Sequence, residues 1–436
     1  MTKTSSQYIC QQCGYSQVGW AGKCPNCGNW GSLVETLISS DITEKRKDLK
    51  RESAGPILLS SISSRITVRI STQISELDRV LGGGLVAGQV VLIAGEPGIG
   101  KSTLLLQLAD NLGEVLYVSG EESKEQIKVR AERIGVKRKD ISVLDETDVD
   151  AIVAEITRAN SLGCVVVDSI QTMATSDLVG LAGSIGQVRE CAYRLLRCAK
   201  EKNIPLFMVG HVTKEGTVAG PAVLAHIVDT VLWFEGDKSL TLRILRAVKN
   251  RFGPTDEVGI FSMEEKGLVG MVDPEKIFLS KQKKVVTGST ISLIMQGSRP
   301  IMVEIESLLV PTKLAFPRRV AQGIDPKRLE LLLAVLSRRC GLSLYEQDCF
   351  VNVAGGITAK DPSVDLAICL SIASVFFDKP LPPATVALGE VGLLGEIREV
   401  VAQERRVKEA KRLGFKNAIT NKECAYLPKA IRQYIK

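Results

Sequence analysis

The stretch GEPGIGKST, residues Gly95 to Thr103, decides the fold class of this 436-residue chain. It follows the apolar run QVVLIA and precedes LLLQLA, an order that predicts a strand, a glycine-rich loop and a helix. The loop matches GxxxxGK[ST] in full, a pattern in which backbone N–H groups surround phosphates at the start of a helix. The sequence therefore predicts an α/β domain that binds a nucleotide.

Two side chains of this loop have predicted roles of their own. We expect Lys101 to reach the β- and γ-phosphates of ATP, and the hydroxyl of Ser102 to hold Mg²⁺. The predicted nucleotide-binding residues are Gly95, Glu96, Pro97, Gly98, Ile99, Gly100, Lys101, Ser102 and Thr103.

Three other apolar runs lead to residues that suit hydrolysis. CVVVDS contains Asp168, which we expect to hold Mg²⁺ unless it only caps its strand. VLYVSGEES places Glu121 and Glu122 past a strand, where a carboxylate can orient the attacking water, and we prefer Glu121. IPLFMVG leads to His211, either a γ-phosphate sensor or a partly packed imidazole. The pattern predicts a mostly parallel sheet with the nucleotide at its carboxyl edge.

Four cysteines form two CxxC pairs within the first 27 residues. Each pair aims two sulfurs at one point, and four thiolates complete the closed tetrahedral shell of a structural Zn²⁺ site. The predicted ligands are Cys10, Cys13, Cys24 and Cys27, with four ordinary thiols or a redox CxxC as the alternatives. The aromatic and basic residues of this module either contact nucleic acid or a partner protein, or form its small core: Tyr15, Trp20, Lys23 and Trp30.

Composition and length bound the class of protein. Hydrophobic residues make up 45% of the chain and charged residues 24%, so large cores can form. The formal charge of +7 permits a nucleic-acid partner without requiring one. No apolar signal segment opens the chain, no run suits a membrane span, and the scattered cysteines fit a reducing compartment. We therefore expect a cytoplasmic protein with no membrane contact.

Changes of composition divide the chain into four parts. A polar, charged stretch without apolar periodicity follows the cysteine module and predicts a flexible linker. The pattern changes again after Met271, where a new series of strands and helices begins. The predicted parts are residues 1–35 for the four-cysteine module, 36–56 for the linker, 57–272 for the nucleotide-binding domain and 273–436 for an α+β domain.

LDRVLGGGLVAGQVVLIAGEPGIGKSTLLLQLA resembles the core of the RecA-type ATPases. With the four cysteines and the motif KNRFG, residues Lys249–Gly253, the chain resembles the family of bacterial RadA (Sms) DNA-repair proteins. The resemblance implies a RecA-like ATPase in which Lys101, Glu121 and Asp168 are catalytic. Lys249 and Arg251 are two cations before a glycine turn, so they either reach a neighbour's γ-phosphate or form a solvated turn.

The resemblance also implies partners. These are single-stranded and branched DNA bound without sequence preference, the RecA recombinase in branch migration, and further copies of the chain in a homohexamer. Two glycine-rich segments are candidate DNA loops, residues 172–190 with Arg189 and residues 213–221 with Lys214. The alternative function is a KaiC-like signalling or scaffold ATPase that does not move along DNA.

The C-terminal region resembles the peptidase domain of Lon in FVNVAGG, in a DPS turn and in GEVGLLGEI. Ser363 falls at the serine position of that family, but counting from the glycine that opens GEVGLLGEI puts Glu404 at the position of the lysine base. A serine without a base is a poor nucleophile, so we expect no proteolysis. We expect Ser363 to cap a helix N-terminus, and Arg405 and Arg406 to belong to a basic surface strip.

Overall fold

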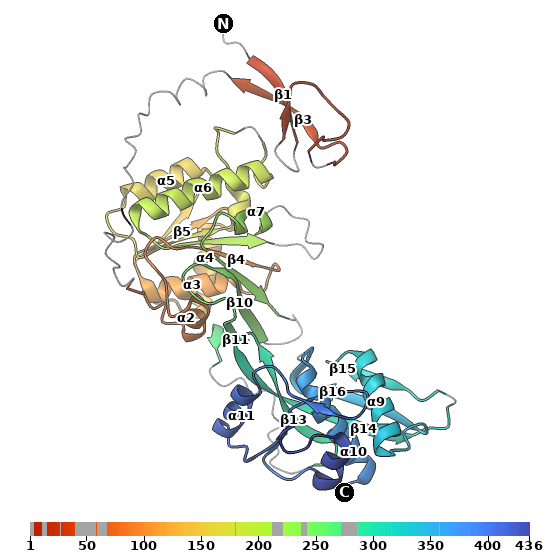
Figure 1. The fold of residues 1–436 in the computed structure, drawn as a ribbon. Coiled ribbons are helices and arrows are strands. Elements are labelled where there is room, and N and C mark those ends of the chain that lie inside the picture. The colour runs from red at the N-terminus through yellow and green to blue at the C-terminus, as the bar shows by residue number, and fades with distance from the viewer. Residues whose placement is uncertain are drawn as a thin grey trace. The chain divides into compact units, whose positions relative to one another are not determined.

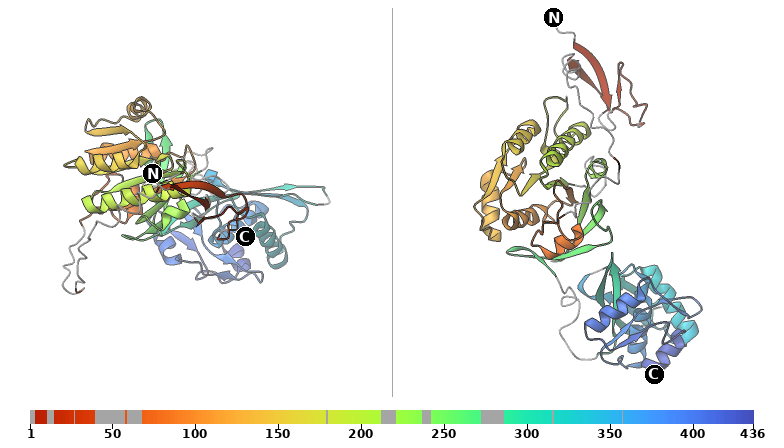
Figure 2. Two further views of the ribbon diagram at one scale, coloured as in Figure 1. Left: turned by 90° about the horizontal axis from the view of Figure 1, so that it is seen from above. Right: turned by 60° about the vertical axis from the view of Figure 1, so that its left-hand side comes forward.

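The computed structural model describes residues 4–10, 15–26, 28–39, 58, 68–178, 180–211, 221–236, 242–271, 286–314, 316–356 and 358–436. The chain divides into two compact units, Met1–Met271 and Val272–Lys436. Figure 1 labels the elements of both units, and Figure 2 shows them from two further sides.

The first unit contains a nine-stranded sheet with β4, Val90–Gly95, near its middle. The strand order is β12-β11-β10-β9-β4-β8-β7-β5-β6. The strands from β9 to β6 run parallel, and β10, β11 and β12 extend the sheet as antiparallel neighbours. The other strands are β5 Val115–Ser119, β6 Ile141–Asp145, β7 Cys164–Asp168, β8 Leu206–His211, β9 Thr230–Glu235, β10 Leu242–Asn250, β11 Val258–Glu264 and β12 Gly267–Gly270. The predicted, mostly parallel α/β sheet is confirmed.

Helices cover both faces of this sheet, because successive side chains of a buried strand face opposite sides. On β4, Val91 and Ile93 pack in the same core as α2, α3 and α4, whereas Val90 and Leu92 pack in the core of α5 and α6. Figure 1 shows these two sets of helices on opposite sides of the sheet. The helices are α2 Ser75–Leu81, α3 Lys101–Leu112, α4 Lys124–Ile134, α5 Val149–Arg158, α6 Ile185–Lys202 and α7 Pro221–Ala225, with a 3₁₀ turn at Ile170–Thr172.

The register of the parallel strands brings the predicted site residues to one edge. Gly95 of β4 pairs with His211 of β8, and Ser119 of β5 pairs with Asp168 of β7. Glu121 follows β5 after one intervening residue. The carboxyl ends of these strands therefore lie at a single edge of the sheet, as the sequence pattern predicted.

The N-terminal module is a three-stranded sheet of order β2-β1-β3. Its strands are β1 Thr4–Cys10, β2 Ser16–Gln17 and β3 Leu33–Ser39. The last strand runs past residue 35, where the sequence predicted the module to end. The predicted linker was residues 36–56; residues 36–39 belong to β3 instead, and the rest lies outside the described residues.

The second unit has a six-stranded mixed sheet of order β15-β16-β14-β13-β17-β20 and a small β18-β19 ladder. Its strands are β13 Ser289–Gln296, β14 Arg299–Pro311, β15 Arg319–Gln322, β16 Gln347–Val353, β17 Thr385–Ala387, β18 Glu390–Val391, β19 Ile397–Arg398 and β20 Asn417–Ile419. Its helices are α9 Pro326–Cys340, α10 Asp365–Phe377, α11 Gln403–Arg412 and α12 Leu427–Tyr434, with 3₁₀ turns at Ala354–Gly356 and Pro362–Val364. This is the predicted α+β architecture, and its likeness to Lon peptidases stays a prediction.

None of the helices in the described ranges combines the length and the apolar character that crossing a membrane requires.

Candidate active site

The phosphate loop turns from β4 into α3 at the carboxyl edge of the large sheet. Gly98 and Gly100 have φ angles of 76° and 117°, a left-handed backbone that glycine adopts without strain. A Cβ on Gly100 would lie 2.7 Å from Cε of Met263, so the turn also lacks room for a side chain there. Within the described residues no side chain caps the start of α3. Its first N–H groups are therefore left for an anionic phosphate.

Lys101, the first residue of α3, is held inside the loop. Its side chain is 3% exposed, and its Nζ donates hydrogen bonds to the carbonyl oxygens of Gly95, at 2.8 Å, and Glu96, at 2.9 Å. An ammonium group has three donors, so one remains for a phosphate oxygen. Burial lowers the pKa of Lys101 to about 8, against the opposing attraction of Asp168 and Glu121. A bound phosphate would favour the charged form and raise that pKa.

Asp168 ends β7 beneath the loop and is 8% exposed. The hydroxyl of Tyr117, on the neighbouring strand β5, donates a 2.7 Å hydrogen bond to Asp168 Oδ2. Burial, and then the charge of Asp168, raise the pKa of Tyr117 well above its usual value, so this hydroxyl stays a proton donor at neutral pH. One oxygen of Asp168 is thereby fixed, while the carboxylate as a whole is of the type that Mg²⁺ prefers.

The two adjacent glutamates after β5 point to different partners. Glu121 Oε1 accepts a hydrogen bond from the hydroxyl of Ser169 and lies 3.4 Å from His211 Nε2. Glu122 instead forms an ion pair with Arg130 of α4. Of the two side chains, Glu121 is the one that contacts other residues of the candidate site, which supports the preference for it as the catalytic carboxylate.

His211 closes the site at the end of β8. Burial lowers its pKa, and so does the nearby Lys101 cation, while Glu121 and Asp168 oppose the shift. The imidazole is therefore mainly neutral at pH 7. Both ring nitrogens are buried, and neither makes a hydrogen bond to the described residues. The backbone oxygen of His211 accepts a 3.3 Å hydrogen bond from Gln171 Nε2, which ties the end of β8 to the turn after Asp168.

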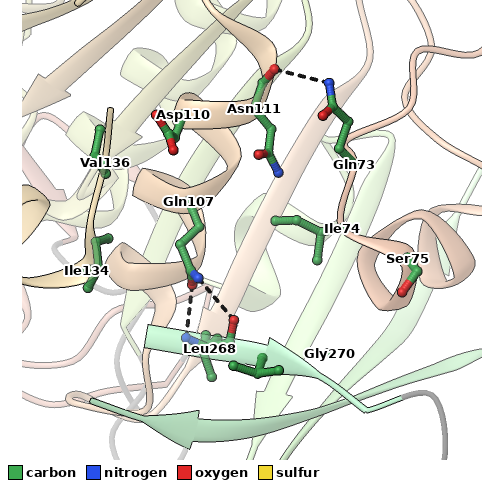
Figure 3. Close-up of a pocket in the computed structure, with 11 residues that line it drawn as sticks. Gln73, Ile74, Ser75, Gln107, Asp110, Asn111, Ile134, Val136, Leu268 and Gly270 are labelled. Atoms are coloured by element: carbon green, nitrogen blue, oxygen red, sulfur yellow. Dashed lines mark hydrogen bonds between the residues drawn. The ribbon is translucent and has the colours of Figure 1, made fainter. Parts of the chain in front are cut away.

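A second hollow lies on the flank of α3, away from the phosphate loop, and Figure 3 shows it. It is lined by Gln73, Ile74, Ser75, Gln107, Asp110, Asn111, Ile134, Val136, Leu268, Val269 and Gly270. The side chain of Gln107 bonds both the N–H and the C=O of Leu268, each at 3.0 Å, and so ties α3 to β12. No cation is among these lining residues, so the hollow lacks the charge that a nucleotide's phosphates require.

Two of the four predicted zinc ligands, Cys10 and Cys24, are each 1% exposed in the N-terminal module. Each opens a turn that a backbone hydrogen bond closes, from Cys10 N to Tyr15 O at 2.8 Å and from Cys24 N to Asn29 O at 2.9 Å. Cys13 and Cys27 lie outside the described residues. Buried thiols at the start of such turns fit a soft metal ion with sulfur ligands.

Comparison with known proteins identifies the family. Residues 60–217 match a family model described as an AAA domain, and residues 8–35 match one described as a rubredoxin metal binding domain. The chain is 51% identical over 426 residues to the DNA repair protein RadA of Bacillus subtilis, which covers 96% of this chain and 93% of that protein. It is 46% identical over 425 residues to the DNA repair protein RadA of Halalkalibacterium halodurans, with 96% and 93% covered.

The chain belongs to the RadA family of DNA repair proteins. The family predicted from the sequence is thus confirmed. The AAA domain and the RadA relatives identify an ATP-hydrolysing enzyme, and the rubredoxin-type match identifies the N-terminal module as metal-binding. The individual site residues are not tested by these comparisons and stay predictions, supported by the geometry above.

The KNRFG motif of this RadA-family chain lies at the sheet edge opposite its own phosphate loop. β10 ends at Asn250, which pairs with Thr230 at the start of β9. Arg251 Nη1 lies 3.5 Å from Asp229 Oδ1, and Oδ2 of that aspartate accepts a 3.0 Å hydrogen bond from the N–H of Val90, the first residue of β4. The phosphate loop begins at the other end of β4, about 17 Å away at ~3.3 Å per residue. Arg251 therefore cannot reach phosphates held by its own loop.

The two cations of the motif are held differently. Lys249 Nζ donates to the carbonyl oxygens of Ala225, at 2.7 Å, and Val228, at 2.8 Å, so it braces the segment after α7. Burial lowers the pKa of Lys249, and so does the neighbouring Arg251 cation. The side chain of Arg251 is 57% exposed and is the freer of the two to meet a partner.

The first candidate DNA loop is anchored at its base. Gln187 of α6 bonds the backbone of Thr175 in both directions, at 2.9 and 3.0 Å. Arg194 forms ion pairs with Asp150 and Asp177. Leu181, near the middle of the loop, is 86% exposed. The second candidate loop, with Lys214, lies outside the described residues except for Pro221.

In the second unit, two predictions about the peptidase-like site are wrong. Ser363 is not the helix cap, because Asp361 Oδ1 accepts the hydrogen bond from Ser363 N at 3.0 Å. Glu404 does not face the serine, since its side chain is 86% exposed and pairs with Lys422. Counting residues missed the position because helix α11 turns another of its residues inward.

That inward residue is Arg406, which is 1% exposed. Its guanidinium donates to Ser363 Oγ at 2.7 Å, to Leu293 O at 2.6 Å and to Asp361 Oδ2 at 2.6 Å. Ser363 Oγ in turn donates to Leu293 O at 3.0 Å. The serine therefore faces a permanent cation that cannot take its proton. The predicted basic surface strip is also wrong for Arg406, although Arg405 beside it is exposed.

Sequence reasoning did not assign roles to three residues of these sites. Ser169 stands beside Asp168 in the quoted run CVVVDS, and Tyr117 stands in VLYVS. For Tyr117 the available signal was a polar residue within a buried strand, and for Ser169 it was a hydroxyl directly after the strand that ends at Asp168. Arg406 carried no such signal, because its burial follows from the packing of α11.

Replacement of Glu121 by Gln tests which glutamate acts on water. Glu121→Gln keeps the size of the side chain but removes the base, so we expect the turnover number to fall about 10²- to 10⁴-fold with nucleotide affinity retained. The matched control is Glu122→Gln, which loses only the contact to Arg130. Equal turnover in the two variants, measured by phosphate release, would reject the assignment.

The pKa of Lys101 predicts a pH dependence of nucleotide binding. Above pH 8 the free protein carries neutral Lys101 and must take up a proton to bind phosphate, so we expect the affinity for ADP to fall up to tenfold per pH unit. Titration of ADP by calorimetry between pH 7 and pH 10 measures this. The control is Lys101→Arg, because its side chain stays charged over this pH range. If the affinity of the parent protein depends on pH as little as that of this variant, the prediction is wrong.

Loss of Arg406 is expected to destabilise the second unit. Arg406→Ala leaves the carboxylate of Asp361 and three further acceptors without their cation, a change that costs about 3–5 kcal/mol when an ion pair is buried. The neighbouring exposed Arg405→Ala is the control, with an expected change within about 0.5 kcal/mol. Urea unfolding of both full-length variants measures the difference, and equal midpoints would show that the buried arginine contributes little.

Proposed function

We propose that this chain is a DNA-dependent ATPase of the ring-forming motor type, acting in the cytoplasm in homologous recombination and DNA repair. The observation that carries the proposal is the common edge that holds the phosphate loop, Glu121, Asp168 and His211, from which both candidate DNA loops start. The printed name of the relatives supports DNA repair as the process. The proposed substrates are single-stranded and branched DNA, and the proposed partner in branch migration is the RecA recombinase.

In this proposal the loop residues bind ATP and the edge residues act on the attacking water. Lys101 and the first N–H groups of α3 hold the phosphates, and Glu121 orients the water and takes its proton. Asp168 and Ser102 would hold Mg²⁺, which neutralises charge on the β- and γ-phosphate oxygens when bound. Ser169 fixes the orientation of Glu121 through its hydrogen bond.

His211 is proposed to report the state of the γ-phosphate to DNA. Its Nε2 lies 3.4 Å from Glu121 Oε1, and in the sequence the second candidate DNA loop starts two residues after it, at Thr213. Gln171 links the same backbone to the turn that leads into the first loop. We propose that a shift of His211 is passed through its backbone to Gln171 and so to the start of the first loop.

Hydrolysis is proposed to require a neighbouring copy of the chain. Arg251 lies too far from its own phosphate loop to act there, and its exposed side chain suits a contact with the γ-phosphate of an adjacent subunit. A cation supplied in this way adds roughly 10³- to 10⁵-fold to the rate in other phosphoryl-transfer enzymes. We propose a homohexamer as the assembly that completes each site.

The two flanking parts are proposed to have no catalytic role. Zn²⁺ held by Cys10, Cys13, Cys24 and Cys27 would form a closed structural site, because four protein ligands leave no open position. The C-terminal unit is proposed to be inactive as a protease, since Ser363 contacts Arg406 and no base.

The decisive experiment measures steady-state ATP hydrolysis with and without single-stranded DNA. We expect strong stimulation by DNA, because the loops and the hydrolytic residues share one edge, and no activity in Lys101→Ala. A rate that does not respond to DNA would favour the KaiC-like signalling or scaffold ATPase and would reject the motor.

Mixing two inactive variants tests action between subunits. In a mixed ring, an Arg251→Ala subunit still has Lys101, and a neighbouring Lys101→Ala subunit still has Arg251. The interface between them has both residues, so we expect mixed rings to recover part of the activity. Native mass spectrometry verifies mixing. No recovery in verified mixed rings would show that Arg251 does not act on its neighbour.

A further inference from the structure

The N-terminal module exposes two tryptophans side by side. Trp20 and Trp30 are 67% and 78% exposed, so of the two alternatives that the sequence left open, a role in the module's core does not hold for these two residues. A Cβ on Gly22 would lie 3.5 Å from one ring carbon of Trp30 and 3.8 Å from one ring carbon of Trp20. Both indoles therefore border the same point, and the glycine leaves the surface between them open.

Backbone contacts hold this pair in place. Lys23 and Trp30 form an antiparallel bridge, and Gly31 N donates a 2.8 Å hydrogen bond to Gly22 O. Cys24, which follows Lys23 and is buried, donates a 2.9 Å backbone hydrogen bond to Asn29 O, next to Trp30. Rings presented on such a framework lose little conformational freedom when a ligand binds.

The charge around the rings is positive. Lys23 is exposed, and its Nζ lies 5.9 Å from the centroid of the Trp30 ring. In the sequence from Thr4 to Val34, Lys23 is the only charged residue (Asp, Glu, Lys or Arg). A ligand that stacks on the indoles therefore meets an ammonium group and no side-chain carboxylate from this segment.

We propose that Trp20, Trp30 and Lys23 form a nucleic-acid site of their own, a stacking platform for unpaired bases of single-stranded DNA. Every base has a flat π-face that can stack on an indole, and the lysine can contact the phosphate beside it. A stable protein interface needs about 1,000 Å² of total buried surface, whereas one base needs only one ring. The small size and the single cation of this surface fit a few nucleotides better than a folded partner.

This site goes beyond the proposed motor. The candidate DNA loops of the nucleotide-binding domain offer glycines and cations for the DNA backbone, whereas the module offers aromatic rings for bases. The platform has no set of hydrogen-bond groups that would read a base edge, so it binds without sequence preference.

Tryptophan fluorescence of the full-length protein tests the proposal. The chain has three tryptophans, and the third, Trp233, lies half-buried in β9. Trp233→Phe therefore leaves Trp20 and Trp30 as the only emitters. We expect an oligo(dT) of thirty nucleotides, added at fixed salt in the absence of ATP and ADP, to quench this emission strongly, because stacked bases quench indoles.

Paired substitutions then separate stacking from structure. The double variant Trp20→Ala with Trp30→Ala is expected to bind labelled oligo(dT) about tenfold more weakly in anisotropy titrations, whereas Trp20→Phe with Trp30→Phe keeps most of the affinity. Lys23→Glu keeps both rings and is expected to reduce the slope of log affinity against log salt by about one. Zinc content and circular dichroism verify the fold of each variant.

Two results overturn the platform. One is unchanged emission of the Trp233→Phe protein at saturating oligo(dT). The other is equal affinity of the alanine and phenylalanine pairs, which would point to a protein partner for these rings. Both results are independent of the motor, since DNA stimulation of ATP hydrolysis in the parent chain tests that proposal by itself.

Discussion

The in-register pairing of the parallel strands is the constraint on which the rest of the first unit depends. Because β4 pairs with β8 and β5 pairs with β7, Gly95 lies opposite His211 and Ser119 lies opposite Asp168, all at the carboxyl edge of the sheet. Residues that are far apart in the chain meet there with no help from the loops that join them. A slip of one residue in either pairing would turn the site residues to the other face of the sheet.

Much of this arrangement was predictable from the sequence. The apolar runs gave strands, the phosphate loop fixed the direction of β4, and parallel strands share a carboxyl edge. The choice between Glu121 and Glu122 was harder, since adjacent residues differ only in which way the backbone turns them. In the structure Ser169 bonds Glu121 and Arg130 pairs with Glu122, which supports the preference for Glu121.

The second unit shows where counting along a sequence fails. A helix places a residue inward every three or four positions, so an offset of two residues separates exposed Glu404 from buried Arg406. The sequence also could not show that Asp361, two residues before Ser363, caps the turn in its place. Both errors concern side-chain direction, which depends on tertiary packing and not on residue type.

The carboxylate of Asp229 links the KNRFG motif to the strand that carries the phosphate loop. It bonds Val90 at the start of β4 and contacts Arg251, while the far end of the same strand is the phosphate loop. β4 is a buried strand in the middle of the sheet, and it joins these two places directly. In a ring of the proposed kind, Arg251 at one end of β4 would contact the nucleotide of a neighbouring subunit. The phosphate loop at the other end of β4 would hold the subunit's own nucleotide. Each nucleotide site would then be linked to the next one around the ring. Hydrolysis at successive sites would follow an order.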